Sequence, residues 1–301
     1  MIPVIIFAAL LALSPAPARA DALVPLQVAY AGSMGAMMDG AIKPAVAKAL
    51  GAGLRGRAQG STGLAHLIAA GSISPDVFIS ITPDPMRIVL NAGKAREAEP
   101  IARTEIVLAY SRSGGYSSML AKADRPGAGP WWPILESRGF RFGRTDPLTD
   151  PQGLNIIFTM RLAADYYHQP DLADRILGPL INPRQIFQEP QVMARLQSGQ
   201  LDAAAAYKTQ PRALGLPFIE LPEEINLGAA SMETRYRHAA VTLNGKTLHP
   251  APLLFYAAAL TGAPHPDLAA RFVEWLRGPQ ARTILSHYYY DDPGDAKPLV
   301  K

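Results

Sequence analysis

Two serines stand at turns that could hold a small anion. Ser33 follows the apolar run "LQVAYA" at 26–31, and Ser61 follows the strand-like stretch "GLRGRAQG" at 53–60. Each serine precedes a segment with the apolar spacing of a helix. The N–H groups of a helix's first turn have no partner within the helix, and the helix dipole adds positive potential there. The predicted chemistry is the binding of an anion by N–H and hydroxyl donors.

A single Gly-Ser turn more often does no more than cap its helix. Here, however, two such turns end the strands of neighbouring strand–helix units. Ligands of open α/β sheets bind outside the carboxyl ends of the strands. We therefore expect Ser33 and Ser61 to border one crevice.

The elements that position these serines form an alternating pattern. Strand-like runs at 26–31, 75–81 and 105–111 alternate with helical segments in the first third of the 301-residue chain. This pattern predicts the α/β class, with doubly wound, parallel strands.

The first twenty residues have the features of a secretory signal peptide. An apolar run at 2–13 is followed by prolines and by the cleavage pattern Ala18-Arg19-Ala20. We expect cleavage near Ala20 and a periplasmic protein. The chain contains no cysteine, which excludes disulfides and thiolate metal sites.

Motifs for catalysis are missing from the sequence. The sequence contains no G-x-S-x-G, Walker A or H-E-x-x-H pattern, the "GSMG" turn at 32–35 is not a G-x-G-x-x-G dinucleotide turn, and the six histidines are scattered. We expect a binding protein without a cofactor, not an enzyme. An enzyme or a sensor remains the alternative from another class. The formal charge of +4 comes from scattered residues, so we expect no nucleic-acid partner.

Ordered segments along the chain resemble the periplasmic molybdate- and tungstate-binding proteins of ABC transporters. The matching segments are "YAGSM", "QGSTGLAHLIAAGSISPDVFIS", "DPLTDPQG", "EPQVMARLQSGQLDAAAAYKT" and "IELPEEINLG". The last three are similar to the tungstate-binding branch of the family. No single segment is highly specific, but the ordered set covers nearly all of the chain after residue 26.

The resemblance implies a type II periplasmic binding protein, with two doubly wound α/β lobes and a ligand cleft between them. Crossing strands would join the lobes, and we assign this role to "EIVLAYS" and "AAAAYKT". After a signal peptide at 1–20, the expected lobe 1 covers residues 21–108 and 209–301, and lobe 2 covers 109–208.

The resemblance also implies a site and its ligand. Ser33 and Ser61 would donate to a tetrahedral oxyanion, and Tyr207 would close the site or pack beneath it. Asp150 and Glu189 would ligate the molybdenum or tungsten centre of the anion. The alternatives are that Asp150 is only a turn residue and that Glu189 only suits the first turn of a helix.

The sequence departs from the family pattern after Gly153, where Leu154-Asn155 replaces a common Tyr-Arg pair. This departure leaves open another inorganic anion or a small organic anion as the ligand. Met34, Met37 and Met38 are unusual after the first turn, and their spacing favours core packing. The expected partners are the oxyanion and a membrane ABC permease, and the expected oligomeric state is a monomer.

Overall fold

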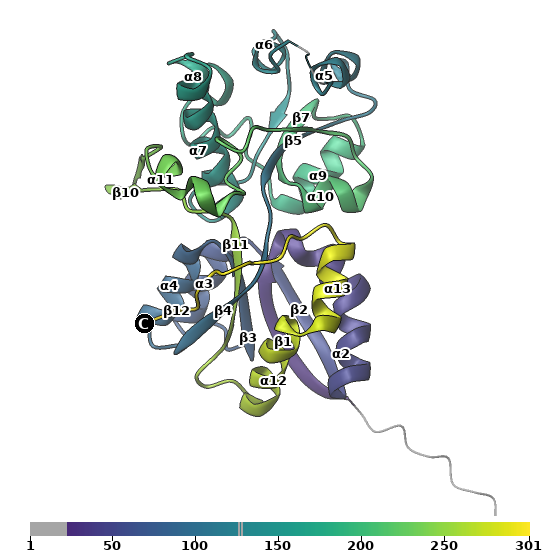
Figure 1. Ribbon diagram of the computed structural model, residues 1–301, viewed down its shortest axis with the longest axis vertical. Coiled ribbons are helices and arrows are strands. Elements are labelled where there is room, and N and C mark those ends of the chain that lie inside the picture. Colours follow the sequence, from purple (N-terminus) through teal and green to yellow (C-terminus); the bar gives the residue numbers. More distant parts are fainter. Residues whose placement is uncertain (1–22, 126, 128) are drawn as a thin grey trace, which may run out of the picture.

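Two β-sheets, one in each of two lobes, organise the chain (Figure 1). The computed structural model describes residues 23–125, 127 and 129–301. The predicted signal peptide lies outside the described residues. Within them, no helix is both long enough and apolar enough to cross a membrane. The predicted two-lobed α/β architecture is confirmed.

The first lobe is built on a six-stranded sheet. Its strands β1, β2 and β3 are parallel, as predicted, whereas β11 runs antiparallel to both β3 and β4. In sheet order the strands are β12 (Leu299–Val300), β4 (Glu97–Arg103), β11 (Leu254–Ala259), β3 (Val77–Ile81), β1 (Val24–Ala31) and β2 (Ala52–Gln59). The helices of this lobe are α2 (Lys43–Leu50), α3 (Ser61–Ala69), α4 (Pro83–Asn91), α12 (Pro266–Arg277) and α13 (Pro279–His287).

The second lobe is built on a four-stranded sheet. Its order is β6 (Phe142–Gly143), β7 (Ala203–Tyr207), β5 (Ile106–Tyr110) and β8 (Phe218–Glu220). Its helices include α5 (Ser117–Ala123), α6 (Trp132–Leu135), α7 (Pro151–Tyr166), α8 (Leu172–Leu177), α9 (Glu189–Gln197) and α10 (Thr209–Leu214). The short elements α11 (Glu233–Tyr236), β9 (Val241–Leu243) and β10 (Lys246–Leu248) also lie on this lobe (Figure 1).

The structure corrects the expected crossings between the lobes. The runs "EIVLAYS" and "AAAAYKT" become β5 and β7, which pair with each other inside the second sheet. Every residue of both strands is buried, so their apolar character reflects a central position in the sheet. The chain instead crosses between β4 and β5, and again before β11 (Figure 1).

The expected lobe boundaries shift accordingly. Strand β8 pairs with β5, so residues 218–220 belong to the sheet of the second lobe and not to that of the first. The return to the first sheet comes at Leu254, where β11 begins, and not at residue 209. A second lobe that extends to about residue 253 fits the sheets.

The segment after β1 is an irregular helix. It begins as a 3-10 turn at Gly32–Met34, continues as α1 (Gly35–Met37) and passes through a π-helical stretch at Met38–Ile42 before α2. Met34, Met37 and Met38 are almost fully buried, in accord with the predicted core packing. Short π-helical stretches occur often near functional sites.

Candidate functional site

The first of the two turns predicted to bind an anion follows β1 in lobe 1. Ser33 lies in the 3-10 turn, and its buried hydroxyl has no hydrogen-bond partner among the described residues. The backbone carbonyl of Ser33 accepts a hydrogen bond of 3.4 Å from the Tyr290 hydroxyl. The Ser33 hydroxyl is therefore free to bond to a ligand.

The second turn joins β2 to α3. Ser61 is the first residue of α3 and is 1% exposed. Its hydroxyl oxygen accepts a hydrogen bond of 3.3 Å from the Ile81 N–H at the end of β3. The hydroxyl can still donate its proton, but Ser61 lines neither of the two cavities described below.

Lobe 2 contributes Asp150 at the start of α7. Asp150 is the N-cap of this helix, and its Oδ1 accepts a hydrogen bond of 2.9 Å from the Gln152 N–H. Gly153 is required in the same turn, because a Cβ there would collide with the Thr145 carbonyl oxygen. The "DPQG" segment therefore fixes the place of the Asp150 carboxyl group at the cleft.

Glu189, the other carboxyl group of lobe 2, begins α9. Its Oε1 accepts a hydrogen bond of 2.8 Å from Gln210 Nε2. Gln210 Oε1 in turn accepts bonds from the Tyr207 N–H at 2.8 Å and from Gln152 Nε2 at 2.6 Å. A chain of side-chain amides thus connects α7, α10 and α9 behind the cleft.

The two lobes meet where these groups face each other. A Cβ at Gly32 would collide with Glu189 Oε2, and a Cβ at Gly60 would lie 2.6 Å from the Thr149 carbonyl oxygen. The Gly63 N–H of α3 donates a 3.0 Å hydrogen bond to the same Thr149 oxygen. The serine turns of lobe 1 therefore pack directly against the carboxyl-bearing turns of lobe 2.

Two cavities open at this contact. The first, of about 580 Å³, is lined in lobe 1 by residues that include Gln59, Gly60 and Gly63, and in lobe 2 by Thr145, Asp146, Thr149, Asp150 and residues 186–191, which include Glu189. The second, of about 310 Å³, has a mostly apolar lining that includes Ser33, Met37, Glu189, Met193, Gln210 and Tyr288. Both cavities share Gly32, Ala58, Glu189 and Pro190, so Glu189 borders both of them.

The electrostatics of the site are unusual for anion binding. Every charged side chain that lines the two cavities is acidic, namely Asp146, Asp150 and Glu189. Burial raises the pKa of Asp150 to about 6. Burial and, after it, the charge of Asp150 raise the pKa of Glu189 well above its usual range. Both carboxyl groups therefore bind a proton more readily in this structure than exposed carboxyl groups do.

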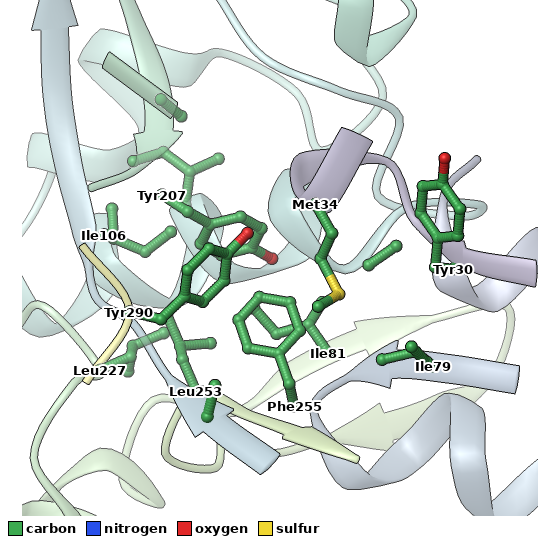
Figure 2. Close-up of a cluster of buried hydrophobic side chains, with 14 of the residues drawn as sticks. Tyr30, Met34, Ile79, Ile81, Ile106, Tyr207, Leu227, Leu253, Phe255 and Tyr290 are labelled. Carbon is green, nitrogen blue, oxygen red and sulfur yellow. The ribbon is translucent and has the colours of Figure 1, made fainter. Parts of the chain in front are cut away.

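Tyr207 lies beneath the site. It is 1% exposed, and its hydroxyl oxygen accepts a hydrogen bond of 3.1 Å from Asn155 Nδ2. Figure 2 shows it next to Tyr290 in a buried cluster that also includes Met34, Ile106 and Phe255. Tyr207 could have closed the site or packed beneath it, and its burial in this structure corresponds to packing.

The sequence reasoning missed the amide chain behind the carboxyl groups. Gln152 stands inside the quoted "DPQG" segment, but a glutamine in a helix usually reads as an exposed residue. Gln210 follows "AAAAYKT" directly and is 8% exposed. The need for glycine at positions 32 and 60 becomes visible only when the opposite lobe is in place.

Comparisons with known proteins agree with this architecture. The profile of the family described as "bacterial extracellular solute-binding protein" matches residues 26–291. The molybdate/tungstate-binding protein WtpA of Pyrococcus abyssi is 28% identical over 212 residues, which are 63% of this chain and 60% of the relative. The chain thus spans about 60% of the length of this curated relative.

Solved structures share the fold. The periplasmic molybdate-binding protein of Azotobacter vinelandii superposes with a TM-score of 0.58 and 18% identity, over 88% of this chain and 98% of that one. Iron-bound HitA of Pseudomonas aeruginosa superposes with a TM-score of 0.56 and 18% identity, over 92% of this chain and 90% of that one. At such identities the likeness establishes the two-lobed fold and leaves the ligand open.

Proposed function

Because the chain belongs to the family of bacterial extracellular solute-binding proteins, we propose that it captures molybdate or tungstate between its lobes. It delivers the anion to a membrane ABC permease and does not transform it. The bound anion is cargo, so the protein needs no cofactor of its own. The relative from Pyrococcus abyssi, whose name states molybdate and tungstate binding, supports this choice of ligand.

One observation carries the proposal: hydrogen-bond donors of lobe 1 pack against two carboxyl groups of lobe 2. On one side lie the free Ser33 hydroxyl, the Ser61 hydroxyl and the first turn of α3. On the other side lie Asp150 and Glu189, which are both 8% exposed. A ligand for this cleft must accept hydrogen bonds at one side and tolerate or use carboxyl groups at the other.

A metal oxyanion meets both requirements. Its oxygen atoms accept hydrogen bonds from the serine turns, as anions do at helix N-termini. Its hard, high-valent centre can take carboxylate oxygen atoms as further ligands. Sulfate and phosphate lack such a centre, so an ionised carboxylate beside them only repels. We therefore assign Asp150 and Glu189 as ligands of the molybdenum or tungsten atom.

Calorimetric titration of the purified protein tests the proposal. Tungstate and molybdate are expected to bind, whereas sulfate and phosphate at the same concentrations give no heat of binding. The variants Asp150→Asn and Glu189→Gln keep the size of the side chains and one acceptor oxygen, but they cannot form an anionic ligand. A tungstate Kd that is strongly raised but still measurable in both variants supports metal ligation, and binding at the wild-type level in both refutes it.

A second candidate ligand is a small organic anion. The apolar cavity of about 310 Å³ beside Glu189 offers room for a carbon skeleton next to the polar cavity. Titration with a series of small carboxylates and phosphate esters distinguishes the two ligands. Binding of one of these compounds, with no binding of tungstate or molybdate, would favour the second candidate.

A further inference from the structure

The side-chain amide of Gln210 has only one possible orientation. The Tyr207 backbone N–H, which lies 2.8 Å away, is always a donor, so the atom of Gln210 that faces it must be Oε1. The other end of the amide, Nε2, therefore faces Glu189 Oε1 at 2.8 Å and donates to it. Gln152 Nε2 adds a second donor to Gln210 Oε1 at 2.6 Å.

This orientation assigns different tasks to the two oxygen atoms of Glu189. Oε1 is held as an acceptor by Gln210. Oε2 points away from the amide toward the 3-10 turn of lobe 1, where a Cβ at Gly32 would collide with it but would lie 3.7 Å from Oε1. Glu189 therefore presents Oε2 to the turn that carries the free Ser33 hydroxyl.

We infer that Gln210 is a positioning residue that holds Glu189 in one rotamer and directs its Oε2 into the ligand site. Gln152 supports this role, because its bond to Gln210 joins α7, which Asp150 caps, to the orientation of Glu189 on α9. The side-chain amides of Gln152 and Gln210 in this way fix the position of the Glu189 carboxyl group relative to that of Asp150. The inference rests on the proposed oxyanion capture and names the carboxyl oxygen that meets the ligand.

The first test needs no ligand. We expect a crystal structure of the unliganded wild-type protein to show Glu189 Oε1 on Gln210 and Oε2 toward Gly32. In Gln210→Met, which preserves volume but has no donor, the Glu189 carboxyl group should move to another rotamer. An unmoved carboxyl group would overturn the inference, even if the protein bound neither tungstate nor molybdate.

The second test is a double-mutant cycle with tungstate as the titrant. Loss of the hydrogen bond that orients Glu189 should raise the Kd in Gln210→Met about 10-fold to 100-fold. In a Glu189→Ala background the same substitution should change the Kd less than 2-fold, because Gln210 then has no carboxyl group to position. An equal weakening in both backgrounds would indicate a merely structural role and would overturn the inference.

Two further variants keep the cycle interpretable. Gln185→Met is the matched control, since Gln185 bonds only within lobe 2, to Arg144 and to the Ile176 carbonyl oxygen, and it should leave the Kd unchanged. Gln152→Met removes only the support behind Gln210 and should raise the Kd in the same direction by a smaller factor. If Gln210→Met fails to fold, Gln152→Met carries the cycle, and a Kd unchanged in that variant would contradict the inference.

Discussion

A single methyl group at Gly60 should obstruct the contact between the lobes without disturbing either one. Gly60 has φ −54° and ψ 127°, a conformation that alanine adopts freely. An alanine Cβ would lie 2.6 Å from the Thr149 carbonyl oxygen and 3.1 Å from the Asp150 Cα, whereas ordinary contact begins at 3.4 Å. Because both atoms belong to the backbone of the opposite lobe, the lobes themselves must separate.

The size of the effect follows from this overlap. Overpacking by one methylene costs about 1 to 3 kcal/mol, and here the cost falls on the closed state alone. Separation of the lobes also lengthens the 3.0 Å bond from the Gly63 N–H to Thr149. Since ligand capture requires hinge closure, we expect the Kd for tungstate to rise about 5-fold to 150-fold in Gly60→Ala.

Calorimetry and thermal unfolding of the unliganded variant provide the assay. The melting temperature should stay near that of the wild type, since the open state accommodates the methyl group. Gly115→Ala is the matched control, because a Cβ there meets nothing within 4 Å and Gly115 lines neither cavity, and its Kd should be unchanged. Wild-type affinity in Gly60→Ala would show that the observed contact between the lobes is not the one that holds the ligand.

Three further predictions concern the site and the fold. Ser33→Ala should weaken tungstate binding at unchanged stability. Ser61→Ala should also lower the free energy of unfolding by about 1 to 3 kcal/mol, because the buried Ile81 N–H loses its acceptor. Urea titrations that show equal stability for the two variants would contradict this prediction. The melting temperature of the unliganded protein should fall as the pH rises from about 4 to 6. In this range the native Asp150, with a pKa of about 6, retains its proton after the unfolded chain has lost it. An equally steep fall of the melting temperature with pH in Asp150→Asn would show that Asp150 is not its cause. Asp76→Ala should lower the free energy of unfolding, measured by urea denaturation, by about 3 kcal/mol. The fully buried Asp76 side chain accepts hydrogen bonds from the Gln27 and His265 backbone N–H groups at 2.8 Å and 2.7 Å. A loss below about 1 kcal/mol would argue against the importance of these two hydrogen bonds.

Local patterns in the sequence were sufficient to predict two strand–helix junctions of lobe 1. The apolar run before Ser33 and the Gly-Ser turn at Ser61 both predicted strand–helix junctions, and β1, β2 and β3 are parallel as expected. Such junctions depend on neighbouring residues and on the handedness of strand–helix units. The sequence therefore predicted them without knowledge of the rest of the fold.

The crossings between the lobes could not be predicted in the same way. A strand that is buried on both faces and a strand that leads from one lobe to the other are both uniformly apolar. The runs at 105–111 and 203–209 looked like crossings, but they pair with each other as β5 and β7. Pairing between residues about one hundred positions apart leaves no trace in the spacing of apolar side chains.

The lobe 2 part of the site shows the same limit. Asp150 and Glu189 were named through a family resemblance, because nothing in their spacing implies that the two carboxyl groups interact. Gln210, which orients one of them, resembles any polar residue of a short helix. Its burial and its three hydrogen-bonding partners arise only when α7, α9 and α10 pack together.

The most direct test of the central claim is anomalous diffraction from crystals grown with tungstate. The tungsten atom scatters strongly, so its position is measured independently of the protein density. We predict a single peak in the cleft, within bonding distance of the Asp150 and Glu189 carboxyl groups, with Ser33 and Ser61 donating to the oxygen atoms around it. A cleft without tungsten at saturating tungstate, or a peak elsewhere on the protein, would contradict the account.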